Sequence, residues 1–179
     1  MPLLAQRTRE LKIKNGVELD AEMGPVISRV AQERISGYVG IGKDEGAQLV
    51  VDGRNFQAAK AGAGTENGFW IGGSLFDHVT PDMKIYKEEI FGPVLSMIRA
   101  HNFDDALRIA NNTEYGLTGA VYSQKRERLE QARREYHVGN LYLNRKCTGA
   151  IVGIHPFGGF NMSGTDSKAG GPDYLLLFT

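Results

Sequence analysis

The sequence contains a single cysteine and no long apolar run among its 179 residues. One thiol, Cys147, cannot form an internal disulfide, so we expect a reducing compartment, in the simplest case the cytoplasm. The apolar runs are only a few residues long, whereas a membrane-spanning helix needs about 20 apolar residues. The N-terminus also lacks the basic start and apolar core of a secretory signal. These absences predict a protein without a membrane segment or an export signal.

The sequence has no excess of charge of either sign, because 21 basic residues balance 21 acidic ones. A chain without net charge gives no support for binding to nucleic acids or to membrane surfaces. Arginines between residues 126 and 134 form a local basic cluster, but glutamates at 127, 130 and 135 interleave with them. This mixture predicts a solvated helix face.

Several familiar site patterns are also missing. The sequence has no Gly-x-Gly-x-x-Gly and no phosphate-binding Gly-x-x-x-x-Gly-Lys-Ser/Thr. The four histidines are scattered and show no metal-ligand spacing, so we predict no metal site. No catalytic group can be assigned from spacing alone.

The hydrophobic periodicity predicts an α/β protein with a parallel sheet, organised as a single domain over residues 1–179. Helices are expected at 3–14, 28–45, 103–110 and 125–136, and strands or extended segments at 48–51, 68–75, 94–98, 117–122 and 138–144. Strands that alternate with helices imply right-handed crossovers and parallel pairing. Ligands bind such sheets where loops leave the carboxyl ends of strands. Residues 54–67 are expected to form a mobile surface loop.

The most informative stretch is Glu-Glu-Ile-Phe-Gly-Pro-Val at residues 88–94. A carboxylate such as Glu89 can accept hydrogen bonds from both hydroxyls of a ribose. The nearby aromatic Phe91 can face a flat heterocycle, and Gly92-Pro93 can hold the turn that presents both side chains. The alternative is a capped turn that only precedes the strand at Val94.

A second motif covers residues 145–160 and is rich in glycine. Gly149 and Ala150 can present consecutive backbone N–H groups to an anion, such as a substrate carboxylate. Phe157 and Phe160 can wall the aliphatic part of a small substrate, and Gly153, Gly158 and Gly159 allow close backbone approach. The alternative is an ordered loop that only packs on the sheet. Long loops without secondary structure are usually functional or disordered, and the apolar residues here argue against disorder.

Two further features have competing interpretations. Residues 161–174 contain glycine, serine and lysine, as phosphate sites do, but a series of structural turns is the preferred interpretation. Cys147 follows Arg145 and Lys146 and could act as a nucleophile in a hydrolase-like site. A small buried or half-buried cysteine is the preferred alternative. His155, between Ile154 and Pro156, is expected to be a packing residue.

Three elements resemble the aldehyde dehydrogenase superfamily in order and spacing: residues 88–94, Asn-Asn-Thr-Glu-Tyr-Gly-Leu at 111–117, and His-Pro-Phe-Gly-Gly-Phe at 155–160. The resemblance extends over essentially the whole chain. The first part of the chain, up to about residue 100, is most similar to methylmalonate-semialdehyde dehydrogenases. Residues of about 114–178 are most similar to 1-pyrroline-5-carboxylate dehydrogenases, which oxidise glutamate γ-semialdehyde.

The resemblance implies a fold, a cofactor and site residues. The fold would be the later part of the aldehyde dehydrogenase catalytic domain, without the Rossmann-type cofactor domain. Glu89 and Phe91 would bind the ribose and ring of NAD or NADP. Gly149 and Ala150 would bind the carboxylate of a small aldehyde, and Phe157 would line its pocket.

The resemblance also implies what this chain does not supply. The family's nucleophilic cysteine and general-base glutamate precede the matched segment, so we assign no catalytic residue and expect the isolated chain to be inactive. Family interfaces left exposed would favour a homo-oligomer or an aggregate. The alternative is a truncated or engineered α/β module without catalytic function that associates through its exposed apolar surface.

Overall fold

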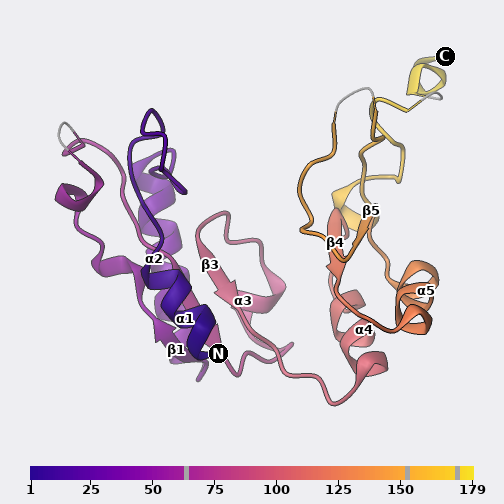
Figure 1. Cartoon of the computed structure of the whole chain (residues 1–179), viewed down its shortest axis with the longest axis horizontal. Helices are drawn as coiled ribbons and strands as arrows, with labels where there is room; N and C mark the ends of the chain where they lie inside the picture. The colour runs from indigo at the N-terminus through magenta and orange to yellow at the C-terminus, as the bar shows by residue number, and fades with distance from the viewer. Residues whose placement is uncertain (63–64, 152–153, 172–173) are drawn as a thin grey trace. The chain divides into compact units, whose positions relative to one another are not determined.

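The computed structural model describes residues 1–62, 65–151, 154–171 and 174–179. It divides into two compact units, Met1–Arg99 and Ala100–Thr179, and each unit is described by itself (Figure 1). Within the described ranges, every helix is too short or too polar to cross a bilayer. A single domain over residues 1–179 stays a prediction.

The first unit contains a three-stranded sheet in the order β1 (Gln48–Val51), β2 (Ser74–Asp77) and β3 (Val94–Ser96). β2 and β3 are parallel, as predicted, but β1 and β2 are antiparallel. A parallel connection needs a long crossover, usually a helix. The described part of the β1–β2 connection contains only two short 3₁₀ helices, Gly53–Asn55 and Ala58–Ala61, so the strand returns in the opposite direction and the sheet is mixed.

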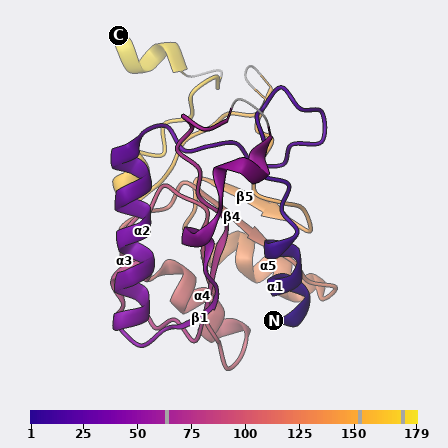
Figure 2. The same ribbon diagram turned by 90° about the vertical axis from the view of Figure 1, so that its left-hand side faces the viewer.

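Two longer helices flank these strands, α1 (Pro2–Arg9) and α2 (Arg29–Asp44), as Figure 2 shows. α2 begins where the sequence predicts, because the Ser28 side chain accepts a hydrogen bond from the Ala31 N–H at 3.1 Å. Past its end, Gly46 adopts a left-handed φ of 95°, and the Ala47 N–H bonds to the Gly42 carbonyl. The sequence did not predict the short helix α3 (Lys84–Lys87).

The main core of the first unit lies between α2 and the sheet. Ile35 and Val39 of α2 and Phe76 of β2 have no exposed surface. They are buried with Ala47, Ile71, Val79, Ile85 and Ile90. Ile90 belongs to the predicted cofactor segment, so the core itself fixes part of that segment.

The predicted surface loop at residues 54–67 is mostly exposed in its described part, but it contains two short 3₁₀ helices and is anchored at Ala61 and Thr65. Ala61 is 2% exposed and packs with Ile13 and Trp70 in a second apolar cluster. The Trp70 indole N–H donates to the Thr65 carbonyl at 2.6 Å. Trp70, which lies outside the segment, provides the surface on which Ala61 is buried, whereas most of the other described residues stay exposed.

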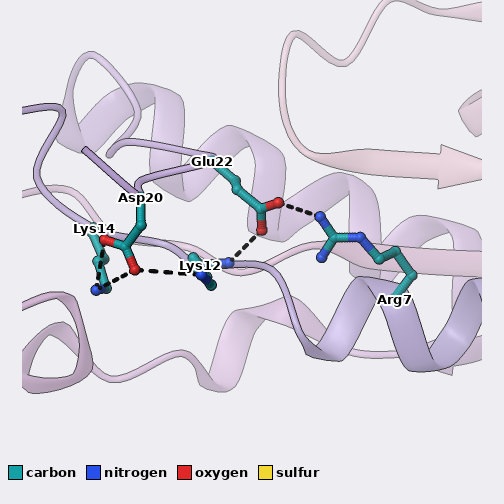
Figure 3. A network of polar contacts seen from close by, with 5 residues as sticks. All are labelled: Arg7, Lys12, Lys14, Asp20 and Glu22. Carbon is teal, nitrogen blue, oxygen red and sulfur yellow. Dashed lines mark hydrogen bonds and ion pairs between the residues drawn. The ribbon is translucent and has the colours of Figure 1, made fainter. Parts of the chain in front are cut away.

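The predicted first helix is also too long, because α1 ends at Arg9. Ile13 instead forms a parallel bridge with Met23 and is buried in the second cluster. Polar contacts hold the intervening segment, as Figure 3 shows: the Arg7 side chain and the Lys12 backbone N–H donate to Glu22, and the Lys12 and Lys14 side chains pair with Asp20. Exposed ion pairs contribute little individually, so burial of Ile13 is the stronger reason for ending the helix.

A buried carboxylate stands at the end of β2. Asp77 is 3% exposed, and the Arg99 guanidinium donates to both of its oxygens, at 3.1 and 2.5 Å. The Asp77 carboxylate also accepts from the His78 backbone N–H at 2.9 Å. The hydrogen bonds from Arg99, assisted by the His78 N–H, lower the pKa of Asp77 to about 2.

The second unit is a strand–helix–strand unit with one further helix. α4 (Phe103–Asn111) precedes β4 (Thr118–Val121), α5 (Arg126–Glu135) and β5 (Asn140–Leu143). β4 and β5 pair in parallel, as predicted for strands joined by a crossover helix. Asn102 caps α4 as expected, since its side chain accepts from the Asp105 N–H at 2.8 Å. The arginines of α5 are largely exposed, which confirms the solvated helix face.

The chain after β5 lies directly against the strand. A Cβ on Gly139 would stand 1.6 Å from the carbonyl oxygen of Gly158, and a Cβ on Gly158 would stand 2.4 Å from the Ser167 carbonyl oxygen. Three stretches of backbone therefore pack without intervening side chains. The close approach predicted for the glycine-rich segment is confirmed at Gly158. The corresponding prediction for Gly153 lies outside the described residues.

We expect acid to destabilise the first unit between about pH 4 and pH 2. The pKa of Asp77 is about 2 in the folded chain and 3.8 ordinarily. A carboxyl group whose pKa falls on folding contributes stability that is complete above its unfolded pKa and lost as pH falls through the folded value. Urea unfolding midpoints measured from pH 6 to pH 2 should therefore decrease below pH 4.

Arg99→Gln should lower the urea midpoint at pH 6 and weaken its dependence on pH. Arg34→Gln is the matched control, because it removes the same charge from an exposed position on α2. Equal pH profiles for the two variants would contradict the assignment of this effect to Asp77.

Gly139→Ala should destabilise the second unit. Its new methyl group would meet a backbone oxygen, which cannot move aside as a side chain can. Overpacking of this kind costs about 1–3 kcal/mol, measurable as a lower free energy of unfolding in urea. Gly37→Ala, on α2 with nothing within 4 Å of the added carbon, should be neutral or stabilising. Wild-type stability in Gly139→Ala would contradict the close backbone contact.

Candidate functional site

The second unit contains a pocket of about 570 Å³ beside β4 and β5. Thr118 and Tyr142 come from the two strands, and the rest of the lining comes mainly from the glycine-rich segment. The lining residues are Leu117, Thr118, Tyr142, Cys147, Thr148, Gly149, Ala150, His155, Phe157, Ala169 and Gly170. The structure therefore brings together Gly149, Ala150 and Phe157, the three residues predicted to contact a substrate.

Gly149 and Ala150 form a polar part of this pocket. Gly149 has a left-handed φ of 104°, a conformation that favours glycine. Among the described residues, nothing accepts a hydrogen bond from either of the two backbone N–H groups. Two successive amides without acceptors can bind an anionic oxygen.

Phe157 is held by its backbone on both sides. Its N–H donates to the Ala169 carbonyl at 3.0 Å, and the Ala169 N–H donates to the Phe157 carbonyl at 2.8 Å. Asn140 of β5 donates to the Pro156 carbonyl at 3.0 Å and accepts from the Gly158 N–H at 3.2 Å. These four hydrogen bonds fix the peptide that carries the phenyl ring at the pocket wall.

The sequence did not assign a role to Asn140. Its side chain follows the alternation of the strand, which places it on the same face as Tyr142. That alternation was visible in the sequence. The hydrogen bonds to Pro156 and Gly158 were not, because they join residues that are 16 and 18 positions apart.

His155 was expected to pack in an apolar environment, and this prediction is wrong. Its side chain is exposed and lines the pocket. Its Nδ1 atom accepts from the Ile151 backbone N–H at 3.1 Å. Because this contact uses Nδ1 as the acceptor, Nε2 is the ring nitrogen left to donate a hydrogen bond.

Cys147 is exposed and also lines this pocket, so the preferred expectation of a buried or half-buried cysteine is wrong. In the described part of the chain, no histidine is hydrogen-bonded to its sulfur, and a nucleophilic thiol needs such a base or another activating group. Burial raises the pKa of the Tyr136 hydroxyl, and negative charge on Cys147 acts in the same direction. The nucleophile interpretation stays a prediction.

The lysine of the third motif has a structural role. Lys168 donates to the Gly139 carbonyl at 2.7 Å and to the Gly158 carbonyl at 2.9 Å, and it pairs with Asp166. An ammonium group has three protons, so these partners leave none for a phosphate. The structural-turn interpretation is therefore favoured for residues 161–171, and residues 172–173 of this motif lie outside the described residues.

Glu89 and Phe91 line a different pocket, of about 380 Å³, within the first unit. Every second residue from Glu88 to Gly92 is held by contacts with the rest of the first unit. The Tyr38 hydroxyl donates to Glu88, Ile90 is buried in the core, and a Cβ on Gly92 would stand 2.5 Å from Ile35. Glu88 also pairs with Lys84 at 3.8 Å.

The residues between these attachment points are exposed. Nothing in the described structure pairs with the Glu89 carboxylate. Phe91 is 77% exposed and has a φ of 51°, which is unusual for a bulky side chain. A non-glycine residue held in this conformation is strained, and such strain concentrates at functional sites. The segment thus presents one free acid and one free aromatic ring.

Metal chemistry receives no support from the described residues, among which no group of three His, Cys, Asp or Glu side chains could hold an ion.

The predicted site residues fall into two groups, each within one unit. Gly149, Ala150 and Phe157 belong to the 570 Å³ pocket, and Glu89 and Phe91 to the 380 Å³ pocket.

Comparison with known proteins finds a curated relative and a solved structure that have the same enzyme name. A curated 1-pyrroline-5-carboxylate dehydrogenase from Anoxybacillus flavithermus (strain DSM 21510 / WK1) is 55% identical over 175 residues, which is 97% of this chain and 32% of that protein. The solved structure of a 1-pyrroline-5-carboxylate dehydrogenase from Thermus with bound NAD matches with a TM-score of 0.86 at 48% identity, again over 97% of this chain and 32% of the other. The chain spans about a third of the length of these relatives.

A structure from Sinorhizobium meliloti 1021, named as a methylmalonate-semialdehyde dehydrogenase complexed with NAD, matches with a TM-score of 0.80 at 39% identity. It covers 91% of this chain, and this chain covers 34% of it. Both resemblances expected from the sequence are confirmed, and each extends over more than nine tenths of the chain. The predicted fold class, an α/β fold of aldehyde dehydrogenase type, is confirmed as well, although the sheet of the first unit is mixed and not parallel throughout. The model of the aldehyde dehydrogenase family matches residues 1–179, and this chain belongs to that family.

Proposed function

We propose that this chain is part of an NAD-dependent aldehyde dehydrogenase that oxidises a small carboxylated semialdehyde, of the glutamate γ-semialdehyde type, to the acid. NADP is the alternative cofactor. The observation that carries the proposal is the pair of Gly149 and Ala150 amides, without acceptors in the described structure, at a 570 Å³ pocket with Phe157 in its wall. The names of the curated relatives support the same substrate class.

In this proposal, the two amides bind the substrate carboxylate and thereby orient the molecule. Backbone N–H groups bind a carboxylate well because they are fixed before the ligand arrives. The phenyl ring of Phe157 packs on the aliphatic carbons and excludes water from them. Because the Phe157 peptide is held by four hydrogen bonds, the wall keeps its distance from the anion site.

The first unit would bind the nicotinamide half of the cofactor. The Glu89 carboxylate accepts hydrogen bonds from the two ribose hydroxyls, and the Phe91 ring supports the nicotinamide face. The exposed acid and the exposed, strained aromatic fit this group. When bound, NAD supplies the hydride acceptor for the oxidation.

We further propose that the nucleophile and the general base lie outside these 179 residues, as they do in the family pattern. The isolated chain would then bind ligands without turnover, because hydride transfer requires the substrate to be attached to a nucleophile and aligned with the cofactor.

A second candidate is a module without catalytic function that associates with itself or with partners. Its support is the exposed apolar surface at the end of the chain. Leu175 and Phe178 belong to a 3₁₀ helix, Tyr174–Phe178. Leu175 is 77% exposed and Phe178 is 73% exposed. Exposed apolar patches of this kind mark interaction surfaces.

Reduction of NAD, followed at 340 nm with glutamate γ-semialdehyde, separates the two candidates. We expect no turnover from the isolated chain and measurable turnover after addition of a complementary N-terminal fragment from a 1-pyrroline-5-carboxylate dehydrogenase. No turnover in the complemented sample would remove the enzyme proposal. Sizing chromatography of the same isolated chain is the control, since a monodisperse monomer would count against the second candidate.

Glu89→Gln should weaken cofactor binding in the complemented enzyme. Loss of a charged acceptor for two hydroxyls should raise the KM for NAD by about tenfold or more. Glu88→Gln is the matched control, because Glu88 is already bonded to Tyr38 and should affect stability more than the KM for NAD. A KM for NAD that is unchanged in Glu89→Gln would contradict the assigned role.

A further inference from the structure

The pocket of the second unit has a positively charged residue beside its amide pair. Arg145 is exposed and lies two positions after the end of β5 at Leu143. Its Nη2 atom lies 3.3 Å from the point where a Cβ on Gly149 would stand. The guanidinium is therefore next to the first of the two amides that bind an anion in the proposed function.

A second contact fixes the direction of this side chain. The Arg145 Cζ atom lies 5.4 Å from the centre of the Tyr142 ring. A guanidinium over an aromatic face is attracted by the ring and keeps its N–H groups at its edge free to donate. Arg145 is not itself a lining residue, but its guanidinium lies beside two residues that are, Tyr142 and Gly149.

The charge of Arg145 is not neutralised by the protein. In the described ranges, no carboxylate forms an ion pair with Arg145. The lining of the pocket also contains no aspartate or glutamate. A guanidinium that lacks an anionic partner, beside an acid-free pocket, favours a ligand that brings its own negative charge.

We infer that Arg145 is a further binding residue of this pocket and supplies the positive charge that selects a carboxylated aldehyde. This inference rests on the proposed function and adds to it. The Gly149 and Ala150 amides set the position of the carboxylate, while Arg145 provides the charge that an uncharged aldehyde cannot use. The site thus combines fixed backbone dipoles with one exposed cation beside them.

The neighbouring residue Lys146 provides a matched control. It carries the same charge one position further along the chain. Neither residue is among the pocket lining, but only Arg145 lies beside Gly149 and over the Tyr142 ring in the described structure. Arg145→Gln and Lys146→Gln therefore change the net charge equally and differ only in where the charge stands. Arg145→Lys keeps the charge and removes the planar group.

The test is a titration of the isotope-labelled 179-residue chain with L-glutamate, the acid that the proposed reaction forms, followed by NMR at the Gly149 and Ala150 amides. We expect Arg145→Gln to raise the dissociation constant by about tenfold and Lys146→Gln by less than about twofold. Arg145→Lys should recover part of the loss. Pentan-1-ol, which has no charge, should bind the wild type and Arg145→Gln equally.

Each outcome distinguishes this inference from the proposed function. In one outcome, L-glutamate shifts the Gly149 and Ala150 amide signals while its dissociation constant is the same in Arg145→Gln as in the wild type. That result would overturn only the role of Arg145. Equal losses in Arg145→Gln and Lys146→Gln would also overturn it, since the effect would then be one of net charge. No binding by the wild-type chain would overturn both. The amide spectrum of each variant shows directly whether it has folded.

Discussion

The second unit depends on one close contact between backbones, that of Gly139 with Gly158. Because neither residue has a side chain, the segment after β5 can lie directly on the strand that precedes it. Lys168 then donates to the carbonyls of both glycines, and Asn140 bonds to the peptides on either side of Phe157. Without this approach, none of these hydrogen bonds could form. The pocket wall and the Gly149–Ala150 amides follow from the path that the contact sets.

In the segment at residues 88–94, residues held by the first unit alternate with residues that are exposed. Glu88, Ile90 and Gly92 are attached to α2 or buried in the core, and Glu89 and Phe91 remain exposed between them. The core thereby supports the unfavourable backbone conformation of Phe91. Of two adjacent glutamates, the structure pairs Glu88 with Tyr38 and Lys84 and leaves Glu89 without a partner among the described residues. Their order in the sequence does not reveal this division.

Local signals predicted those elements whose limits are set by neighbouring residues. The caps at Ser28 and Asn102 mark the starts of α2 and α4, and Gly46 marks the end of α2. The strand at Gln48–Val51 has the predicted limits. Predictions failed where a distant partner decided the outcome. Ile13 leaves the first helix to pair with Met23, and Ala61 is buried against Trp70 in a segment that looked like a mobile loop. No local pattern contains information about such partners.

The sequence by itself determined the family and the residue types of both candidate sites, because the motifs at 88–94 and 155–160 are contiguous and their glycines restrict the backbone. The tertiary structure decided which of those residues meet. It placed Gly149, Ala150 and Phe157 around one pocket, turned His155 outward, and set the Arg145 guanidinium beside Gly149 and over Tyr142. The physical reason is that close packing and hydrogen bonds between distant residues fix these positions, whereas spacing along the chain fixes only local conformation.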